Sequence, residues 1–502
     1  MQVEPEFSDF TRSYEAGKPS VLWTRLVADL ETPVSAMLKL ANSRPFSFLF
    51  ESVEGGAVRG RYSFIGLRPD LIWRCRGDTS EINRNALSDP ERFERLAGSA
   101  LTNLRTLIAE SRIAVPAQLP PMAAGLFGYM GYDTVRLMER LPDKNPDSIG
   151  IPDAVFLRPT VIAIFDNVED LVTVVTPVWP DPRRNARRAF DDACSWLAEV
   201  VADLDRPLPL KREAEGEPLS LPAPVSNITQ PRYHEMVEQA KEYIRAGDIF
   251  QVVPSQRFHL PFPLPPFALY RALRRLNPSP FLFFLDFGSY ALVGSSPEIL
   301  VRLRDGKVTI RPIAGTRRRG KDGEEDRALA ADLLGDPKEL AEHLMLLDLG
   351  RNDVGRVAKI GTVRVTEKMV IEYYSHVMHI VSNVEGMIDP KYDAMDALIA
   401  GFPAGTVSGA PKVRAMEIID ELEPERRSFY GGAVGYFSAN GAMDTCIALR
   451  TALVKDERMY VQAGGGVVYD SVPEAEYQET VNKAKALIRA AEEAVRFANR
   501  RS

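Results

Sequence analysis

Short apolar runs, bounded by turn residues and rich in Val, Ile, Phe and Tyr, recur through both halves of the chain. Such runs are typical of β-strands. We expect strands over residues 45–53, 61–67, 160–167, 171–179, 249–258, 280–287, 290–296, 298–304 and 307–315. Because these runs cluster between helices instead of alternating with them, antiparallel pairing is favoured over β-α-β units. The sequence therefore predicts an α+β fold of large antiparallel β-sheets flanked by helices.

Helices are expected between and after these runs. The predicted ranges are 91–110, 183–204, 337–353 and 473–498. A further helix begins after Thr229, a suitable N-cap residue, has Pro231 in its first turn and ends before Gly247.

One segment differs in composition from the rest of the chain. Residues 205–225 are rich in proline and charge and have neither a helical nor a strand period. We interpret this segment as a linker between an N-terminal domain, residues 1–204, and a C-terminal domain, residues 226–502. A chain of 502 residues is long enough for two large domains.

Charge and composition argue against several classes of protein. The net charge of −7 lacks the basic balance of proteins that bind nucleic acid. No apolar run approaches the about 18 residues of a membrane helix, and the acidic N-terminus does not resemble a secretion signal. The three cysteines lie far apart, without the spacing of a zinc site or a disulfide framework. We therefore expect a cytoplasmic protein that binds neither nucleic acid nor membranes.

Two pairs of glutamates stand three residues apart on predicted helices. Glu339 and Glu342 form one pair, and Glu476 and Glu479 form the other, with Lys483 one turn further on. Residues at this spacing project from the same helix face. Four carboxylates from two helices suit a hard cation such as Mg²⁺, which keeps waters and shares a ligand's anion. The alternative is that each pair belongs to an ordinary solvated helix face.

Glycine-rich loops and one arginine suggest an anion site. The loops 402–412 and 461–470 can bring backbone N–H groups close to an anion. Neither loop matches a Walker A or dinucleotide motif. Both are also compatible with simple tight turns. Arg450 lies in an apolar run, where a buried arginine needs either a partner carboxylate or a ligand carboxylate. Tyr430 either directs a hydroxyl group into a site or belongs to the core.

Two histidines, His376 and His379, stand three apart in a strand-like run. No third soft ligand follows them, so a metal pair is less favoured than a single neutral histidine that transfers protons. A hydrogen-bonded core histidine is the other interpretation. With no GxSxG motif and no triad, the candidates fit acid–base chemistry and Mg²⁺ electrostatics on a small carboxylate.

Seven motifs follow the predicted linker in a fixed order: PIAGTRRRG, KELAEHLMLLDLGRND, HVMHIVS, FPAGTVSGAPK, YGGAVGYF, DTCIALRTA and QAGGGVVYDSVPEAEYQETVNKAKA. Together they resemble the chorismate-utilising enzymes, most closely the anthranilate synthase component I family, over residues 226–495. The first half is similar to that family's N-terminal domain through FLFESVEGG, GRYSFIGLRP and GLFGYMGYD. The resemblance implies an α/β sandwich of antiparallel sheets flanked by helices.

The resemblance also implies a metal site and a substrate site. Glu342 and Glu479 are expected to bind Mg²⁺, which holds the ring carboxylate of chorismate, while Glu339 and Glu476 hold the waters of the ion. The residues implied to line the substrate are Gly315, Thr316, Tyr430, Arg450, Gly464, Gly465, Gly466 and Lys483.

The implied reaction is that of a carbon–oxygen lyase in the first committed step of tryptophan biosynthesis. Ammonia attacks C2 of chorismate, the C4 hydroxyl leaves, and pyruvate is eliminated to give anthranilate. Glu298 is implied as the acid that protonates the departing hydroxyl, His379 assists the loss of pyruvate, and Thr406 lies near the reacting ring. Hydroxide is a poor leaving group, so the acid is essential, and burial or nearby carboxylates would have to raise the pKa of Glu298.

Two residues distinguish products within the family. Related aminodeoxychorismate synthases commonly carry an attacking lysine at the position of Ala314, and isochorismate and salicylate synthases carry one at the position of Gln251 to activate water. Neither residue here can replace a lysine, which points to anthranilate. The alternatives are 2-amino-2-deoxyisochorismate or aminodeoxychorismate synthase component I, or a non-catalytic sensor of tryptophan or an anion.

Regulation and a partner are implied as well. An allosteric site for feedback tryptophan, between the two domains, is expected at Glu51 and Ser52 together with Pro280, Phe281 and Leu282, where Leu282 stands in place of the family's usual methionine. The chain shows no cysteine nucleophile motif of a glutaminase, so ammonia must come from solution or from a second chain. The resemblance implies a glutamine amidotransferase partner, anthranilate synthase component II, in a heterotetramer.

Overall fold

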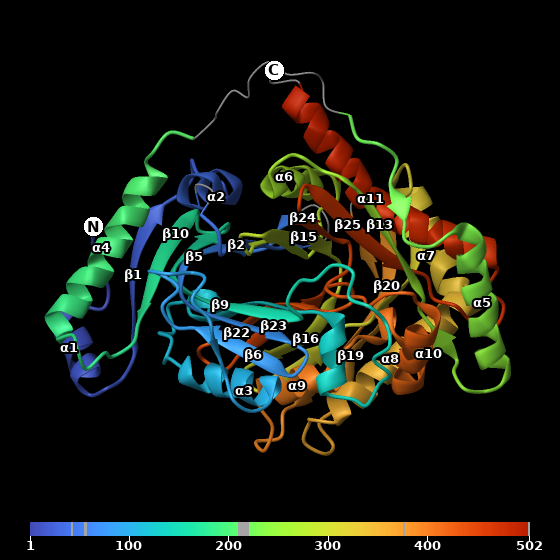
Figure 1. Ribbon diagram of the computed structural model, residues 1–502, viewed down its shortest axis with the longest axis horizontal. Coiled ribbons are helices and arrows are strands. Elements are labelled where there is room, and N and C mark those ends of the chain that lie inside the picture. The colour runs from blue at the N-terminus through green and yellow to red at the C-terminus, as the bar shows by residue number, and fades with distance from the viewer. Residues whose placement is uncertain (42–43, 55–57, 209–219, 375–376, 500–502) are drawn as a thin grey trace.

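The computed structural model describes residues 1–41, 44–54, 58–208, 220–374 and 377–499. His376 and most of the predicted linker, residues 209–219, lie outside these ranges. Strands occupy the middle of the molecule and helices cover its outside (Figure 1). Among the described residues, no helix combines the length and the apolar character that crossing a bilayer requires.

The helices have the following bounds: α1 (Phe7–Glu15), α2 (Pro33–Ala41), α3 (Ala100–Glu110), α4 (Ala186–Leu204), α5 (Gln230–Arg245), α6 (Pro266–Leu276), α7 (Gly323–Gly335), α8 (Pro337–Gly355), α9 (Ala394–Gly401), α10 (Lys412–Leu422) and α11 (Pro473–Asn499). Short 3₁₀ helices are η1 (Pro121–Ala123), η2 (Tyr132–Leu137) and η3 (Gly405–Val407).

The strands have the following bounds: β1 (Ser20–Val27), β2 (Ser47–Glu51), β3 (Val53–Glu54), β4 (Val58–Arg59), β5 (Tyr62–Arg76), β6 (Thr79–Asn83), β7 (Glu94–Arg95), β8 (Gly125–Met130), β9 (Ala154–Asp166), β10 (Leu171–Val178), β11 (Val225–Ser226), β12 (Gln251–Val252), β13 (Ser255–Pro261), β14 (Phe281–Asp286), β15 (Tyr290–Ser296), β16 (Ile299–Arg304), β17 (Lys307–Ile310), β18 (Ile313–Arg318), β19 (Arg364–Tyr373), β20 (Val377–Met387), β21 (Gly409–Ala410), β22 (Ala433–Ser438), β23 (Met443–Ile447), β24 (Thr451–Lys455) and β25 (Arg458–Gly464).

Strands from both sides of the predicted linker pair with one another. A hydrogen-bonded system of 21 strands contains β2 next to β14 and β8 next to β22, and both pairs are antiparallel. In the first pair Glu51 lies opposite Leu282, and in the second Met130 lies opposite Ala433. This arrangement confirms the predicted α+β fold with antiparallel sheets. The division into domains 1–204 and 226–502 stays a prediction.

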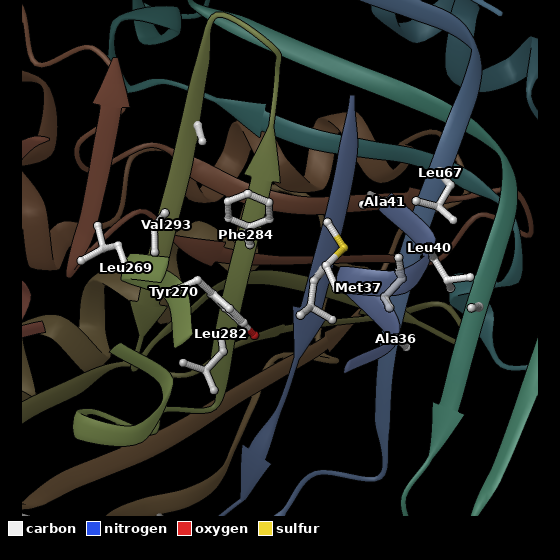
Figure 2. Close-up of a cluster of buried hydrophobic side chains, with 14 of the residues drawn as sticks. Ala36, Met37, Leu40, Ala41, Leu67, Leu269, Tyr270, Leu282, Phe284 and Val293 are labelled. Carbon is white, nitrogen blue, oxygen red and sulfur yellow. The ribbon is translucent and has the colours of Figure 1, made fainter. Parts of the chain in front are cut away.

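Apolar side chains fill the space between the helices and the sheet. Figure 2 shows one such cluster, to which Met37 and Leu40 of α2, Tyr270 of α6 and Leu282 of β14 belong. Full burial of an aliphatic or aromatic side chain contributes about 1.5–3 kcal/mol. The cluster therefore stabilises the contact between segments more than two hundred residues apart, and it fixes the β2–β14 pair.

Proline and glycine explain where the structure departs from the predicted boundaries. The predicted strand over 249–258 is interrupted around Pro254, and that over 307–315 around Pro312, because proline has no N–H to donate to a strand partner. The predicted helix over 91–110 was wrong in its first half. It begins at Ala100, since Gly98 has a φ of +86° and the Ser99 side chain caps the helix by accepting from the Thr102 amide.

The predicted helix start at Thr229 is confirmed. The Thr229 hydroxyl accepts a hydrogen bond from the Arg232 amide, and Pro231 occupies the first turn of α5. Gly247, just past its end, has a φ of +84°.

Gly128 in β8 offers a test of this packing. A Cβ atom at this position would lie 1.9 Å from the Val155 carbonyl oxygen of β9, so Gly128→Ala must push β8 away from its neighbour. We expect the free energy of unfolding to fall by about 3 kcal/mol in denaturant titration. Gly335→Ala is the control, because no atom lies within 4 Å of its added Cβ and its φ is not positive. Equal stability of the two variants would contradict the tight β8–β9 approach.

Candidate active site

A bulge in β18 turns two polar groups toward His379. The register with β20 shifts between Ala314 and Thr316, and Gly315 in between has a φ of +76°. A Cβ atom at Gly315 would also lie 3.1 Å from a carboxylate oxygen of Glu339, so glycine meets both the conformational and the spatial requirement.

His379 of β20 is a neutral imidazole in this setting. Its Nδ1 lies 3.0 Å from the Gly315 carbonyl oxygen and 3.0 Å from the Thr316 hydroxyl. Because the carbonyl can only accept, Nδ1 carries the proton and Nε2 has the free lone pair. Burial, with a smaller contribution from the positive charge of Arg450, lowers the pKa of His379 to about 4, although the hydrogen bond to Gly315 opposes this in part. The ring can therefore take up a proton at Nε2 during a reaction.

Arg450 carries a positive charge without a counter-charge among the described residues. The residue lies just before β24 with a φ of 47°, and burial lowers its pKa. Within the residues that the structure describes, no carboxylate pairs with its guanidinium. Of the two possibilities that the sequence left open, a ligand anion is therefore the one favoured by the geometry.

Glu298 occupies the turn between β15 and β16, with only 4% of its surface exposed. The Thr406 hydroxyl donates a hydrogen bond of 2.8 Å to its carboxylate. Burial raises the pKa of Glu298 to about 8, although the hydrogen bond from Thr406 lowers it in part. Burial, and not a neighbouring carboxylate, is thus what keeps this carboxyl group protonated near neutral pH.

The two predicted glutamate pairs lie close together on α8 and α11. Burial raises the pKa of Glu342, and the negative charges of Glu339 and Glu479 raise it further. Burial and Glu479 likewise raise the pKa of Glu476, one of whose carboxylate oxygens is buried without a hydrogen-bond partner. The two pairs thus lie near each other, with Glu339, Glu342 and Glu476 partly buried and Glu479 exposed, and a metal site here stays a prediction.

Most of these carboxylates already have a protein partner. Glu342 accepts a hydrogen bond of 3.1 Å from the Gln251 amide, and Glu479 pairs with Lys483 at 2.7 Å. Glu339 pairs with Arg317 at 2.8 Å. Across the described ranges, no three His, Cys, Asp or Glu side chains stand close enough together to hold an ion by themselves. Any cation here needs water or a ligand to complete its coordination.

The glycine loop 464–466 closes over this carboxylate cluster. A Cβ atom at Gly464 would lie 3.0 Å from the Tyr430 hydroxyl, one at Gly465 3.1 Å from Glu476, and one at Gly466 2.6 Å from the Gln251 amide nitrogen. The absence of side chains lets the backbone approach these groups directly. Lys483 donates to the Gly464 carbonyl oxygen at 2.9 Å and so ties the loop to α11.

A fully buried ion pair beneath the site was not evident from the sequence. Arg427 and Glu423 pair at 2.6 Å, each with no more than 3% of its side chain exposed. Arg427 also donates to the carbonyl oxygens of Val407 and Val253, both at 2.6 Å. It thereby joins the loop that carries Thr406 to the strand region that carries Gln251. The two carbonyl oxygens that it binds belong to residues far away in the chain, so no sequence motif indicates these contacts.

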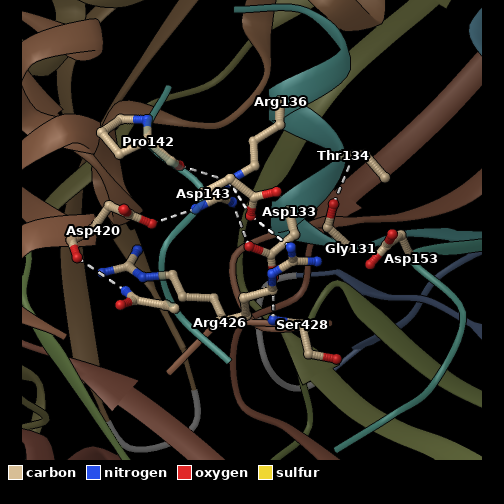
Figure 3. Close-up of polar contacts among 12 residues, drawn as sticks. Gly131, Asp133, Thr134, Arg136, Pro142, Asp143, Asp153, Asp420, Arg426 and Ser428 are labelled. Atoms are coloured by element: carbon tan, nitrogen blue, oxygen red, sulfur yellow. Dashed lines mark hydrogen bonds and ion pairs between the residues drawn. The ribbon is translucent and has the colours of Figure 1, made fainter. Parts of the chain in front are cut away.

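A second polar network lies beside this pair. Figure 3 shows Asp133 and Arg136 of η2 next to Asp420 and Ser428. The Ser428 amide donates to Asp133 at 2.6 Å, and Arg136 bonds both Asp133 and Asp420. Burial raises the pKa of Asp133 to about 6. This network holds the chain after Arg427 against the N-terminal part of the molecule.

The predicted regulatory residues meet at the β2–β14 pair. Glu51, the last residue of β2, lies opposite Leu282 of β14. Ser52 directly follows Glu51 in the chain, Phe281 directly precedes Leu282, and Pro280 comes just before β14.

Two partners of Glu51 were missed at the sequence level. Arg274 of α6 donates to both its carboxylate oxygens, at 2.6 and 2.8 Å, and the Tyr270 hydroxyl bonds it as well. In Figure 2 that hydroxyl points toward β2.

Comparison with known proteins agrees with this architecture. The model of a family described as chorismate binding enzyme matches residues 68–489. Fold and site thus define a chorismate-binding enzyme. The chain is 64% identical to anthranilate synthase component 1 of Cereibacter sphaeroides, over 98% of this chain and 99% of that protein. It is 46% identical to the protein of that name from Synechocystis, over 97% and 99% of the two chains.

Solved structures agree as well. Anthranilate synthase component I from Streptococcus pneumoniae superposes with a TM-score of 0.76 at 39% identity, covering 92% of this chain and 98% of that one. The isochorismate synthase MenF from Escherichia coli, at 20% identity and a TM-score of 0.70, shares the fold. The chain belongs to the anthranilate synthase component 1 family of chorismate-binding enzymes.

Replacing Arg427 by methionine tests the buried pair. Arg427→Met leaves the Glu423 carboxylate buried without its counter-charge, and we expect the free energy of unfolding to fall by about 3–5 kcal/mol. Arg351→Met is the control, because Arg351 is 57% exposed and pairs with Asp348 on the surface of α8, so its loss should change stability by less than about 0.5 kcal/mol. Denaturant unfolding measures both. A loss below about 1 kcal/mol for Arg427→Met would show that the pair is not a major support of the fold.

Proposed function

We propose that the chain is the large subunit of an anthranilate synthase, which converts chorismate and ammonia to anthranilate and pyruvate with Mg²⁺. The observation that carries the proposal is the buried carboxyl group of Glu298, protonated near neutral pH, in a site whose Arg450 has no carboxylate partner in the part of the chain that the structure describes. A dianionic substrate with a hydroxide leaving group needs both features. The family membership narrows the substrate to chorismate.

The carboxylate cluster fits a partly hydrated divalent cation. Glu476 has a buried oxygen without a hydrogen-bond partner, and the partly buried carboxyl group of Glu342 lies near the negative charges of Glu339 and Glu479. Glu342 and Glu479 would hold Mg²⁺ directly, and Glu339 and Glu476 would hold its waters. Mg²⁺ commonly uses one or two protein carboxylates and shares the anion of the substrate. When bound, the ion supplies positive charge to the ring carboxylate of chorismate.

The other side chains bind the substrate and move protons. Arg450 pairs with a carboxylate of chorismate, and Lys483 and the loop that begins at Gly464 surround it. Glu298 gives its proton to the C4 hydroxyl as that group leaves, and Thr406 stabilises the carboxylate that remains. His379 then takes up a proton at Nε2 as pyruvate is lost. The further substrate-lining residues in this proposal are Gly315, Thr316, Tyr430, Gly465 and Gly466.

The proposed product is anthranilate because two nucleophilic side chains are missing. Ala314 is buried at the bulge of β18 and cannot attack the substrate. Gln251 is 3% exposed, and its amide donates to Glu342, so it cannot activate water as a base. Ammonia itself is therefore the nucleophile at C2. The alternatives, aminodeoxychorismate synthase or a non-catalytic sensor, are not favoured by the relatives of this chain.

Variants that replace single carboxyl groups test the proposal. The isolated chain is mixed with chorismate, Mg²⁺ and an ammonium salt, and anthranilate fluorescence is followed. We expect Glu298→Gln to lose at least about a hundredfold in kcat, since general acid catalysis contributes about that much. Glu479→Gln should raise the Mg²⁺ concentration needed for half-maximal rate. Glu492→Gln, exposed on the same helix, is the control. Chorismate consumption without fluorescence would refute anthranilate as the product.

The pH profile gives a second test. Glu298 is active only when protonated, so kcat/KM at a fixed concentration of free ammonia should fall as the pH rises above about 8. Thr406 stabilises the ionised form, so Thr406→Ala should move this fall to higher pH. Thr106→Ala on the surface of α3 is the control. A fall that stays in place in Thr406→Ala would assign it to another group.

We further propose that tryptophan inhibits the enzyme at Glu51, Ser52, Pro280, Phe281 and Leu282. The pairing of β2 with β14 supports this site, since it joins the two predicted domains. Bound tryptophan could then favour one arrangement of the strands over another and change the active site at a distance.

Glu51→Gln removes the negative charge of a carboxylate that Arg274 and Tyr270 hold at the proposed tryptophan site. We expect the tryptophan concentration for half-inhibition to rise about tenfold or more, with kcat unchanged. Asp286→Asn, at the opposite end of β14, is the control. Unaltered inhibition of Glu51→Gln would refute this location.

The proposed partner is a glutamine amidotransferase, anthranilate synthase component II, in a heterotetramer. The name component 1, carried by the relatives, supports a second component. The partner supplies ammonia, and we propose that the assembly works in the cytoplasm.

A further inference from the structure

Arg317 is the one member of the RRR run that contacts the proposed metal site. It stands on β18 directly after Thr316 and pairs with Glu339 at 2.8 Å. Its neighbour Arg318 is 60% exposed and pairs with Glu325 of α7 instead. The two arginines therefore have the same charge and adjacent positions but different partners.

Arg317 is itself held by acids outside the metal site. It pairs with Asp332 of α7 at 2.7 Å and with Asp336 at 2.9 Å, and it donates to the Thr316 carbonyl oxygen at 3.1 Å. Asp336 also caps α8 by accepting from two amides of its first turn. A guanidinium fixed by so many groups cannot follow Glu339 toward a bound ion.

The two glutamate pairs therefore differ in how firmly the protein holds their carboxylate oxygens. Glu476 keeps a buried oxygen without a partner, whereas one oxygen of Glu339 is bound by Arg317. The other oxygen of Glu339 lies against Gly315, 3.1 Å from where a Cβ atom would be. The Arg317 side chain thus holds Glu339 near the other three glutamates.

We propose that Arg317 sets the cation selectivity of the cluster by keeping Glu339 from binding the ion directly. With few direct carboxylates, the site favours a small ion that keeps its waters, as Mg²⁺ does, over Ca²⁺, which takes more oxygen ligands in flexible geometry. Arg317 acts through Glu339 and is a positioning residue. The inference rests on the proposed metal site.

Binding of the two ions to the full chain, without substrate, tests the inference by calorimetry with MgCl₂ and with CaCl₂. Arg317→Gln frees Glu339, and we expect the affinity for Ca²⁺ relative to Mg²⁺ to rise about tenfold. Arg318→Gln is the matched control and should leave the ratio unchanged. Arg317→Lys, which keeps the charge but cannot hold several carboxylates at once, should give an intermediate ratio.

The outcomes separate this inference from the proposed function. An unchanged ratio in Arg317→Gln overturns the inference and leaves the Mg²⁺ site standing. If the unaltered chain binds neither ion and its turnover does not depend on Mg²⁺, both the inference and the proposed Mg²⁺-dependent function are overturned. If Arg317→Gln does not fold, Glu339→Gln removes the same potential ligand. When Glu339→Gln is combined with Arg317→Lys, the affinity for Ca²⁺ relative to Mg²⁺ should return to that of the unaltered chain. A relative affinity that stays at the intermediate value of Arg317→Lys contradicts the inference.

Discussion

The buried pair of Arg427 and Glu423 supports both walls of the candidate site. One guanidinium holds the carbonyl oxygens of Val407 and Val253, and the carboxylate accepts from the amide and the hydroxyl of Ser255. Isolated charges at this depth would be strongly unfavourable, so the pair is tolerated only because nearly every donor and acceptor is matched. Its geometry fixes the Thr406 loop relative to the Gln251 segment.

Above this neutral pair, the site leaves several charges uncompensated. Arg450 has no carboxylate among the described residues, Glu476 has a free buried oxygen, and Glu298 is held in its protonated form by burial. Such groups reduce stability when no ligand is present. They are suited to a ligand that brings its own carboxylates and a cation. The same features that weaken the fold locally therefore account for binding and acid catalysis.

Local patterns predicted the elements of the site but not all of their contacts. Glu339 and Glu342 were expected on one helix face because residues three apart always are, and the ends of one helix followed from Thr229 and Gly247. That α8 and α11 bring their glutamates near each other follows from the tertiary fold and not from the spacing of the residues. Family motifs supplied the roles of the residues, and these roles stay predictions.

Contacts between distant segments could not be predicted from spacing. Arg274 and Glu51 are 223 residues apart, and Arg427 and Val253 are 174 apart. Nothing in the local sequence distinguishes Arg427 from Arg426 beside it, which pairs with Asp143 near the surface. Tertiary packing decides which arginine is buried. The same holds for Arg317 and Arg318, whose side chains leave the strand in different directions.

In the proposed reaction this chain adds ammonia to chorismate and then removes pyruvate. The most direct measurement is mass spectrometry of the products formed by the isolated chain from chorismate, Mg²⁺ and isotopically labelled ammonium. From the proposed reaction we expect labelled anthranilate and pyruvate in equal amounts. An unlabelled hydroxylated product, or a labelled amine that retains the pyruvyl group, would contradict it.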